Sequence, residues 1–393
     1  MDQFDDNTLS NSTPGPIIPE YSTTETVVLE TIEPSAPQPS LAQRIFIGPY
    51  GLRAGWGLLI FIVMIASIVT GIQFLQHHQK AAQQHTAALA AKASGSATPA
   101  PTAKPDKDAP VPMKAFFIGE TISFGVIFLL TWLMSLIERR KLSAYGLGGT
   151  HSIARFFVGA IWGILAISAL IFTLHATHHL TFDSRLLHGS AIFGWGFLVL
   201  VAFLLVGLFE EYLFRGYLQF TFYRGMIGLG NLISPTHARA IAFWIAAIFT
   251  SAIFLIAHTT NGGETPLGLF QVFLAGLVFV VTLWRTGSLW WGIGFHMAWD
   301  WGQSFLYGVP DSGGYFQGRL FVTHASGNPL ISGGTVGPEG SVLCIPLLIV
   351  VITLIFLFVS PSPQPSLEQK SEKDTAGHET YTIVPSGPEP SAS

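Results

Sequence analysis

The sequence predicts an all-α protein: a polytopic membrane helical bundle of about eight transmembrane helices, with disordered tails. Of its 393 residues, 49% are hydrophobic and only 11% are charged, whereas a soluble domain carries about 25% charged residues. Its mean hydropathy is +0.49. Apolar stretches recur along the chain at lengths of about 20 residues, which is what a helix needs to cross a bilayer core. Lipid offers backbone groups no other partner, so these stretches are expected to be helical.

The chain divides by composition into polar and apolar segments. Residues 1–43 are acidic and rich in Ser, Thr and Pro, and are predicted to be a disordered tail. A first transmembrane helix is predicted within 44–76, followed by an Ala-, Pro- and Lys-rich disordered loop over 77–112. The remaining spans fall within 113–360, and 361–393 is a second polar tail. The eight predicted spans are 54–75, 115–137, 153–175, 190–222, 241–260, 267–285, 288–308 and 341–360.

Charge and cysteine content narrow the possibilities further. A net charge of −4 argues against nucleic-acid binding, which requires a basic face. The single Cys344 lies in an apolar run, so no intrachain disulfide can form. Arg139, Arg140 and Lys141 directly follow the second span, and the positive-inside rule then places both termini in the cytoplasm.

Three charged residues interrupt the fourth span in the stretch LFEEYLFRG. Apolar and aromatic residues continue through Tyr223, so one helix is expected to carry Glu210, Glu211 and Arg215 inside the membrane. Glu211 and Arg215 are four residues apart, which favours an ion pair, while Glu210 points about 100° away and has no partner on this helix. Such residues are costly in a bilayer and usually functional. The alternative is three interfacial side chains that extend to the headgroups.

Two other spans each carry a histidine. Phe254 and His258 are four residues apart near the end of the fifth span. His296 and Asp300 have the same spacing in the seventh, where the carboxylate can fix the tautomer of the imidazole. Helical rise gives Glu211 and His296 similar depths, but places His258 about one or two turns deeper. A lone histidine is more often a packing residue, whereas two of them beside a Glu-Glu-Arg helix favour a shared polar site.

Three motifs resemble those of the CPBP family of intramembrane proteases, in the same order on membrane helices. They are Glu210-Glu211-x-x-x-Arg215, Phe254-x-x-x-His258 and His296-x-x-x-Asp300. The family includes CAAX prenyl endopeptidases (Rce1-like) and abortive-infection and bacteriocin-immunity proteins. The flanks EEYLFRGYLQ, AHTTNGGETPLGLFQVFLAG and WRTGSLWWGIGFHMAWDWGQ are similar to bacterial members. The resemblance covers about residues 115–360, and Asp300 departs from the commoner Asn.

The resemblance implies hydrolysis of a peptide bond near the C-terminus of a lipidated or membrane-bound substrate. The expected location is a bacterial cytoplasmic membrane. Glu210 would activate water as a general base, and His258 would help to position or deprotonate that water. His296 and Asp300 would provide the polar side that stabilises the oxyanion.

The remaining motif residues receive supporting roles. Glu211 and Arg215 would hold the helix face, or the guanidinium would bind a substrate carboxylate. Phe254 and Trp299 are expected to line and support the site.

No cofactor is expected, because a glutamate and a histidine can activate water without a metal. The alternative is a zinc site formed by Glu210, His258 and His296, since two histidines and a glutamate form a known catalytic zinc set. No HExxH spacing is present. The expected partners are membrane lipid and a lipidated or membrane-anchored protein or peptide, with no nucleic acid.

Two functions from other classes remain open. One is a non-catalytic bacteriocin self-immunity or partner-binding membrane protein of the same fold, which would have no use for a buried Glu210. The other is an ion or proton carrier, for which intramembrane acids and histidines would also serve. A carrier predicts ionisable residues strung across the membrane, whereas the first three spans are almost free of charge in their middles.

Overall fold

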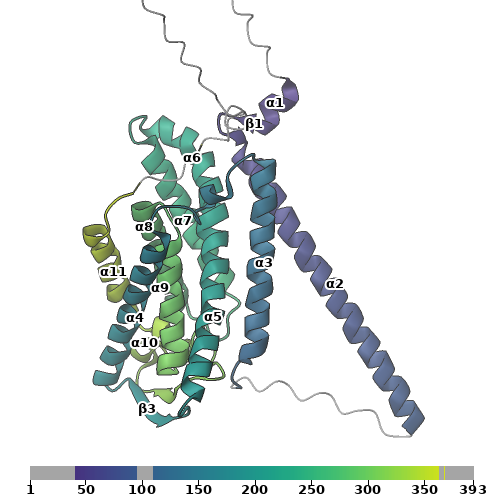
Figure 1. Cartoon of the computed structure of the whole chain (residues 1–393), viewed down its shortest axis with the longest axis vertical. Coiled ribbons are helices and arrows are strands. Elements are labelled where there is room, and N and C mark those ends of the chain that lie inside the picture. Colours follow the sequence, from purple (N-terminus) through teal and green to yellow (C-terminus); the bar gives the residue numbers. More distant parts are fainter. Residues whose placement is uncertain (1–39, 95–108, 363–366, 368–393) are drawn as a thin grey trace, which may run out of the picture. The chain divides into compact units, whose positions relative to one another are not determined.

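The computed structural model describes residues 40–94, 109–362 and 367. Contacts divide the chain into 1–41 and 42–393, and the helical bundle belongs to the second unit. The fold is all-α, as predicted, and within the described ranges six helices are long and apolar enough to cross a membrane (Figure 1). They are α2 (Ala54–Ser94), α3 (Met113–Ile137), α4 (Ser152–Ala176), the continuous run α5 (Ala191–Glu211), η2 (Tyr212–Leu218) and α6 (Gln219–Ile233), α7 (Ala238–His258) and α8 (Pro266–Thr286).

The last two predicted spans are shorter in the structure than in the prediction. α9 (Trp290–Trp301) continues into the π-helical segment η3 (Gly302–Tyr307), which ends at Gly308 with a positive φ of 65°. α11 (Cys344–Phe358) has 15 residues and follows an irregular, glycine-rich segment. Six helices therefore meet the length and composition of a span, against about eight predicted.

The predicted disordered loop over 77–112 differs from the structure in its first half. α2 continues without a break through Ser94. The stretch KAAQQHTAALAAKAS is rich in Ala, Gln and Lys, which have high helix propensity, and the first proline of the segment is Pro99. Composition averaged over the whole segment obscured the fact that its helix-breaking residues lie only in the second half. Residues 95–108 and most of both predicted tails lie outside the described residues.

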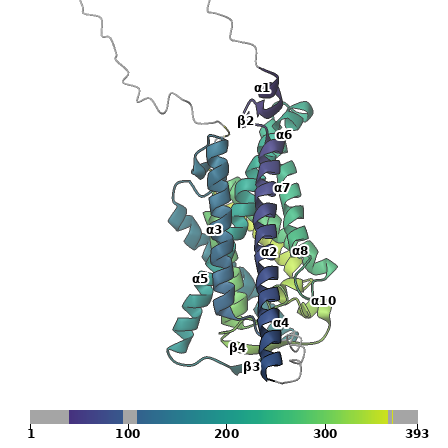
Figure 2. The ribbon, with the colours of Figure 1, turned by 90° about the vertical axis from the view of Figure 1, so that its right-hand side faces the viewer.

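The remaining elements are short and gather at the two ends of the bundle. Strands β1 and β2 form a hairpin at one end, and the antiparallel pair β3 and β4 lies at the other (Figures 1 and 2). These elements are α1 (Leu41–Phe46), β1 (Ile47–Gly48), β2 (Gly51–Leu52), η1 (Leu142–Tyr145), β3 (Leu180–Arg185), β4 (Phe321–Ala325), α10 (Pro329–Ser332) and η4 (Pro338–Gly340).

A buried ion network ties the end of α3 to α6 near the β1–β2 hairpin. The Glu138 carboxylate is fully buried and lies 3.4 Å from Arg140 Nε and 3.1 Å from Arg224 Nη2. The Tyr217 hydroxyl donates a hydrogen bond to the same carboxylate at 3.2 Å, and Arg140 also donates to the carbonyl of Tyr50. Tyr217 lies in η2 and Arg224 in α6, so this network fixes the helix run that carries Glu210.

α4 and α9 cross at close range because glycines remove the side chains between them. A Cβ atom on Gly159 would lie 2.0 Å from the carbonyl oxygen of Trp291, and one on Gly163 would lie 2.3 Å from that of Phe295. From the opposite side, a Cβ on Gly294 of α9 would lie 2.0 Å from a backbone oxygen of α4. The spacing Gly159-x-x-x-Gly163 is typical of helix-packing surfaces in membranes, and it serves that purpose here. The crossing holds the helix that carries His296.

Substituting Gly159→Ala is expected to destabilise the bundle, because the added methyl meets rigid backbone instead of a movable side chain. Overpacking of this kind costs about 1–3 kcal/mol. Thermal unfolding of the detergent-solubilised protein measures the loss. Gly125→Ala is the matched control, since nothing lies within 4 Å of a Cβ at Gly125. Equal unfolding temperatures for the two variants would contradict the close crossing.

Candidate active site

One uninterrupted helix carries all three charged residues of the fourth span. The span predicted over 190–222 is one helix from Ala191 to Ile233 across the α5–η2–α6 junctions, so it ends eleven residues later than predicted. Glu210 and Glu211 are the last residues of α5, and the π-helical segment starts at Tyr212. A second π-helical segment, η3, begins directly after α9, which carries His296. π-helical turns are rare and frequently mark functional sites.

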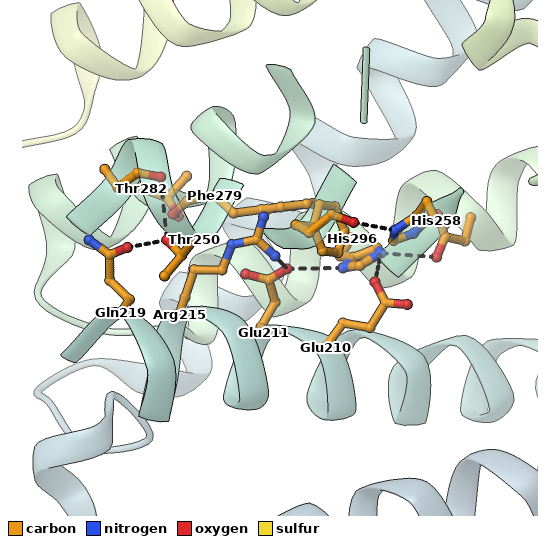
Figure 3. A network of polar contacts seen from close by, with 12 residues as sticks. Glu210, Glu211, Arg215, Gln219, Thr250, His258, Phe279, Thr282 and His296 are labelled. Carbon is orange, nitrogen blue, oxygen red and sulfur yellow. Dashed lines mark hydrogen bonds and ion pairs between the residues drawn. The ribbon is translucent and has the colours of Figure 1, made fainter. Parts of the chain in front are cut away.

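Glu211 is the buried carboxylate of the pair. It is 1% exposed, and its Oε1 accepts a hydrogen bond from Arg215 Nη1 at 3.0 Å. The same oxygen lies 3.2 Å from His296 Nδ1 (Figure 3). The carboxylate therefore joins the helix run α5–η2 to α9, and the i,i+4 ion pair that the sequence suggests is present.

Arg215 is fully buried behind aromatic rings. Its guanidinium carbon lies 4.2 Å from the ring centre of Phe254 and 4.9 Å from that of Phe279. Both distances are typical of cation–π contacts. The guanidinium does not line the cavity described below. The structure therefore supports its role of holding the helix, whereas the alternative contact with a substrate carboxylate does not fit this arrangement.

His296 is the centre of the polar network (Figure 3). With Nδ1 bound to Glu211, its Nε2 lies 3.6 Å from Glu210 Oε2 and 3.4 Å from Asp300 Oδ2. The imidazole stacks on Phe279, with ring centres 4.8 Å apart and an interplanar angle of 23°. Because carboxylates only accept hydrogen bonds, this environment favours N–H groups on the ring.

His258 has a different environment from His296. Its Nδ1 lies 2.8 Å from the carbonyl oxygen of Phe254, which only accepts hydrogen bonds, so Nδ1 carries a proton and donates it. In the neutral ring the other nitrogen, Nε2, is then an acceptor. His258 is the last residue of α7. Among the described contacts it forms no ion pair with Glu210 and no hydrogen bond with His296. It is therefore placed to bind a water or substrate donor.

The polar residues meet at a single cavity of about 490 Å³, which is within the usual range for ligand sites. Glu210, His258, His296 and Asp300 all line it, so both histidines reach one space in spite of their different estimated depths. Glu211 does not line it. The predicted supporting residues, together with several that sequence analysis missed, complete the wall. Among them are Phe254 and Trp299, and then Glu120, Glu264, Gln271, Phe279, Asp311 and Glu339.

The missed residues left little signal in the sequence. Glu120 was detectable only as an acid inside an apolar span, and Phe279 is one of 31 phenylalanines. Asp311 lies in an irregular segment and Glu339 in the short η4, both outside the predicted spans. Their proximity to the motif residues depends on how the loops fold over the bundle, which no spacing rule encodes.

The alternative zinc set is not preformed among the described side chains. Within 40–94, 109–362 and 367, no group of three or more His, Cys, Asp or Glu side chains converges closely enough to hold a metal ion. Glu210, His258 and His296 line one cavity, and the bond from His258 Nδ1 to a backbone carbonyl leaves Nε2 of that ring available to a ligand. The contacts of His296 are with carboxylates.

Replacing Arg215→Met should destabilise the protein, because it removes the strongest partner of a buried carboxylate. Breaking one side of a buried pair costs about 3–5 kcal/mol. In the double variant Glu211→Gln/Arg215→Met no unpaired charge is left, so the loss should be smaller than the sum of the single losses. Unfolding in detergent, analysed as a double-mutant cycle, gives the coupling. Additivity within about 0.5 kcal/mol would contradict the pairing.

Comparison with known proteins identifies the segment that carries this site. Residues 192–302 match the family model described as type II CAAX prenyl endopeptidase Rce1-like. The match spans Glu210 to Asp300 and so includes every motif residue. No curated protein and no solved structure matches the chain. Over this segment the chain is therefore similar to the Rce1-like endopeptidases, and its six long apolar helices are those of a multi-pass membrane protein.

Proposed function

We propose that the protein is an intramembrane endopeptidase in which Glu210 activates water. The substrate is a lipidated or membrane-anchored protein or peptide, cleaved near its C-terminus. The observation that carries this proposal is the division of labour between adjacent glutamates. Glu211 is buried and doubly paired, whereas Glu210 lines the cavity with a side chain that is 17% exposed.

The reaction follows from the groups on the cavity wall. Glu210 takes a proton from water while the water oxygen bonds to the peptide carbonyl carbon. His258 Nε2 accepts the second hydrogen of that water and orients it. As the C–N bond breaks, Glu210 returns the proton to the departing amine. Each proton and bond is thereby accounted for without a further reactant.

The oxyanion is stabilised by His296. Its Nε2–H faces the cavity between Glu210 and Asp300, and a donor fixed in this way stabilises charge that develops in the transition state. Asp300, as a carboxylate, cannot donate to the oxyanion when ionised. Its role is to hold the imidazole and to balance its positive charge, which accounts for the departure from asparagine at this position.

For the location we propose a bacterial cytoplasmic membrane with both termini in the cytoplasm. Arg140 and Arg224 contact Glu138 at the end of the bundle where β1 and β2 lie. Arg44 and Arg53 contact each other at the same end, where the Arg53 guanidinium donates to the Arg44 carbonyl at 2.9 Å. This concentration of arginines at one end supports the orientation under the positive-inside rule.

The variant Glu210→Gln should abolish proteolysis and leave the fold intact, because it removes the base but keeps the shape. Loss of a general base lowers turnover by about 10²–10⁴-fold. The test compares peptide termini across the membrane and secreted proteome of the host with those of wild type. C-terminal fragments or trimmed tails should vanish in the variant while the protein itself persists.

Asp183→Asn is the control, since Asp183 is an exposed carboxylate on β3, outside the cavity. Unchanged termini in Glu210→Gln cells, with a phenotype only on full deletion, would contradict proteolysis. That result would favour a non-catalytic immunity or partner-binding role.

Activity is expected to survive exhaustive metal depletion, because the proposed mechanism needs only Glu210, His258 and His296. The measurement is peptide cleavage by protein treated with chelators, with metal content checked by elemental analysis. Loss of cleavage that Zn²⁺ alone restores would overturn the metal-free mechanism.

A further inference from the structure

The cavity wall is strongly acidic. Six carboxylate side chains line it: Glu120, Glu210, Glu264, Asp300, Asp311 and Glu339. Two histidines line it as well, but none of its lining residues is a lysine or an arginine. The nearest guanidinium of the site, Arg215, is bound to Glu211 behind the aromatic rings. The cavity wall therefore carries more acidic than basic side chains.

Three of the six carboxylates come from loops or short elements next to the helices. Glu264 lies between α7 and α8, Asp311 follows η3, and Glu339 lies in η4. Asp311 Oδ2 accepts a hydrogen bond from the Ser304 hydroxyl at 2.9 Å, and Glu339 Oε1 accepts one from the Ser312 backbone N–H. All these donors are neutral, and in the described part of the chain none of the three acids forms an ion pair with lysine or arginine.

Unpartnered acceptors line the same cavity. Gln271 is 2% exposed, and its amide nitrogen donates to the carbonyl of Ser341 at 2.9 Å. Its Oε1 has no hydrogen-bond partner, and neither has Glu264 Oε2, although both atoms are buried. A buried acceptor without a donor is costly. A ligand that supplies N–H donors would satisfy both atoms.

The pKa values of the loop acids agree with an excess of negative charge that the two histidines offset only in part. Burial raises the pKa of Asp311 to about 6, with the nearby Glu210 carboxylate adding to the effect, while the Ser304 hydrogen bond and the His296 and His258 imidazoles oppose it. Burial also raises the pKa of Glu339 well above its usual value, with Asp311 adding to the effect. A cation between these groups would favour their ionised forms.

We propose that the substrate inserts a lysine or arginine side chain, close to the scissile bond, between Glu264, Asp311 and Glu339. This inference rests on the proposed peptidase function and names its substrate class. A metal ion is a poorer fit, because no three donors converge on one point in the described residues. A free C-terminal carboxylate is a poorer fit as well, because no cation on the wall would receive it. A cationic side chain matches both the charge and the unpartnered acceptors.

The test uses the purified full-length protein in detergent and pairs of quenched fluorescent peptides. The two peptides of a pair are identical except for lysine or norleucine, which has a similar apolar stem without the charge. The position is scanned along the residues that flank the cleaved bond. At one position the lysine peptide should have a kcat/KM at least about tenfold higher, as expected for hydrogen bonds to charged groups.

Substitutions on the cavity wall show which carboxylates cause the preference for lysine. Asp311→Asn and Glu264→Gln should each reduce the ratio of kcat/KM for the lysine peptide to kcat/KM for the norleucine peptide by about tenfold. Asp183→Asn, which removes an exposed carboxylate outside the cavity, should keep the full preference. Equal kcat/KM for lysine and norleucine at every position, or a preference that persists in both cavity variants, would overturn the inference.

Binding to Glu210→Gln protein separates this inference from the proposed chemistry. If no peptide is cleaved by wild type, but the lysine peptide binds about tenfold tighter than its norleucine partner and Asp311→Asn removes the difference, the cation site stands and the peptidase function fails. If both peptides are cleaved equally, the peptidase function stands and the cation site fails. Comparable binding of the two peptides to Glu210→Gln would likewise overturn the cation site.

Discussion

A carboxylate inside a bilayer needs partners, and Glu211 has two, from different parts of the bundle. Arg215 neutralises it from the same helix run, and His296 reaches it from α9. Both contacts involve one oxygen, Oε1, so the positions of η2 and α9 cannot vary independently. The rest of the site depends on this bridge: it fixes the imidazole, and the fixed imidazole presents Nε2 to Glu210 and Asp300.

Charge balance then explains why two adjacent glutamates behave differently. Around His296 there are three carboxylates, and two groups, Arg215 and the imidazole itself, can carry positive charge. Arg215 is committed to Glu211 and shielded by Phe254 and Phe279. A protonated imidazole can balance one of the other two acids but not both. The site therefore keeps one carboxylate in excess on the cavity wall, which is the condition for a base that can accept a proton from water.

The sequence was sufficient where a rule depends on spacing along one helix. The Glu211–Arg215 pair, the long fourth span and the Gly159–Gly163 packing surface all follow from i,i+4 periodicity, and the structure contains each of them. It was insufficient where tertiary packing decides. Neither π-helical segment, nor the stacking of Phe279 on His296, has a signature in periodicity. The extension of α2 shows a different error, because local propensity prevailed where average composition had suggested disorder.

The distribution of charge along the cavity gives the site a direction. Around His296, the imidazole can balance part of the negative charge of Glu210 and Asp300, so the excess of negative charge there is small. In the segments between helices, Asp311 and Glu339 accept hydrogen bonds from neutral donors, and Glu264 Oε2 has no hydrogen-bond partner. Asp311 is buried, so its charge is screened less than that of an exposed carboxylate. A peptide with one cationic side chain gains most when that side chain lies among the loop acids, which leaves its carbonyl near His296. Electrostatics would thus select one of the two chain directions for the bound peptide, a choice that an apolar cavity of the same shape could not make.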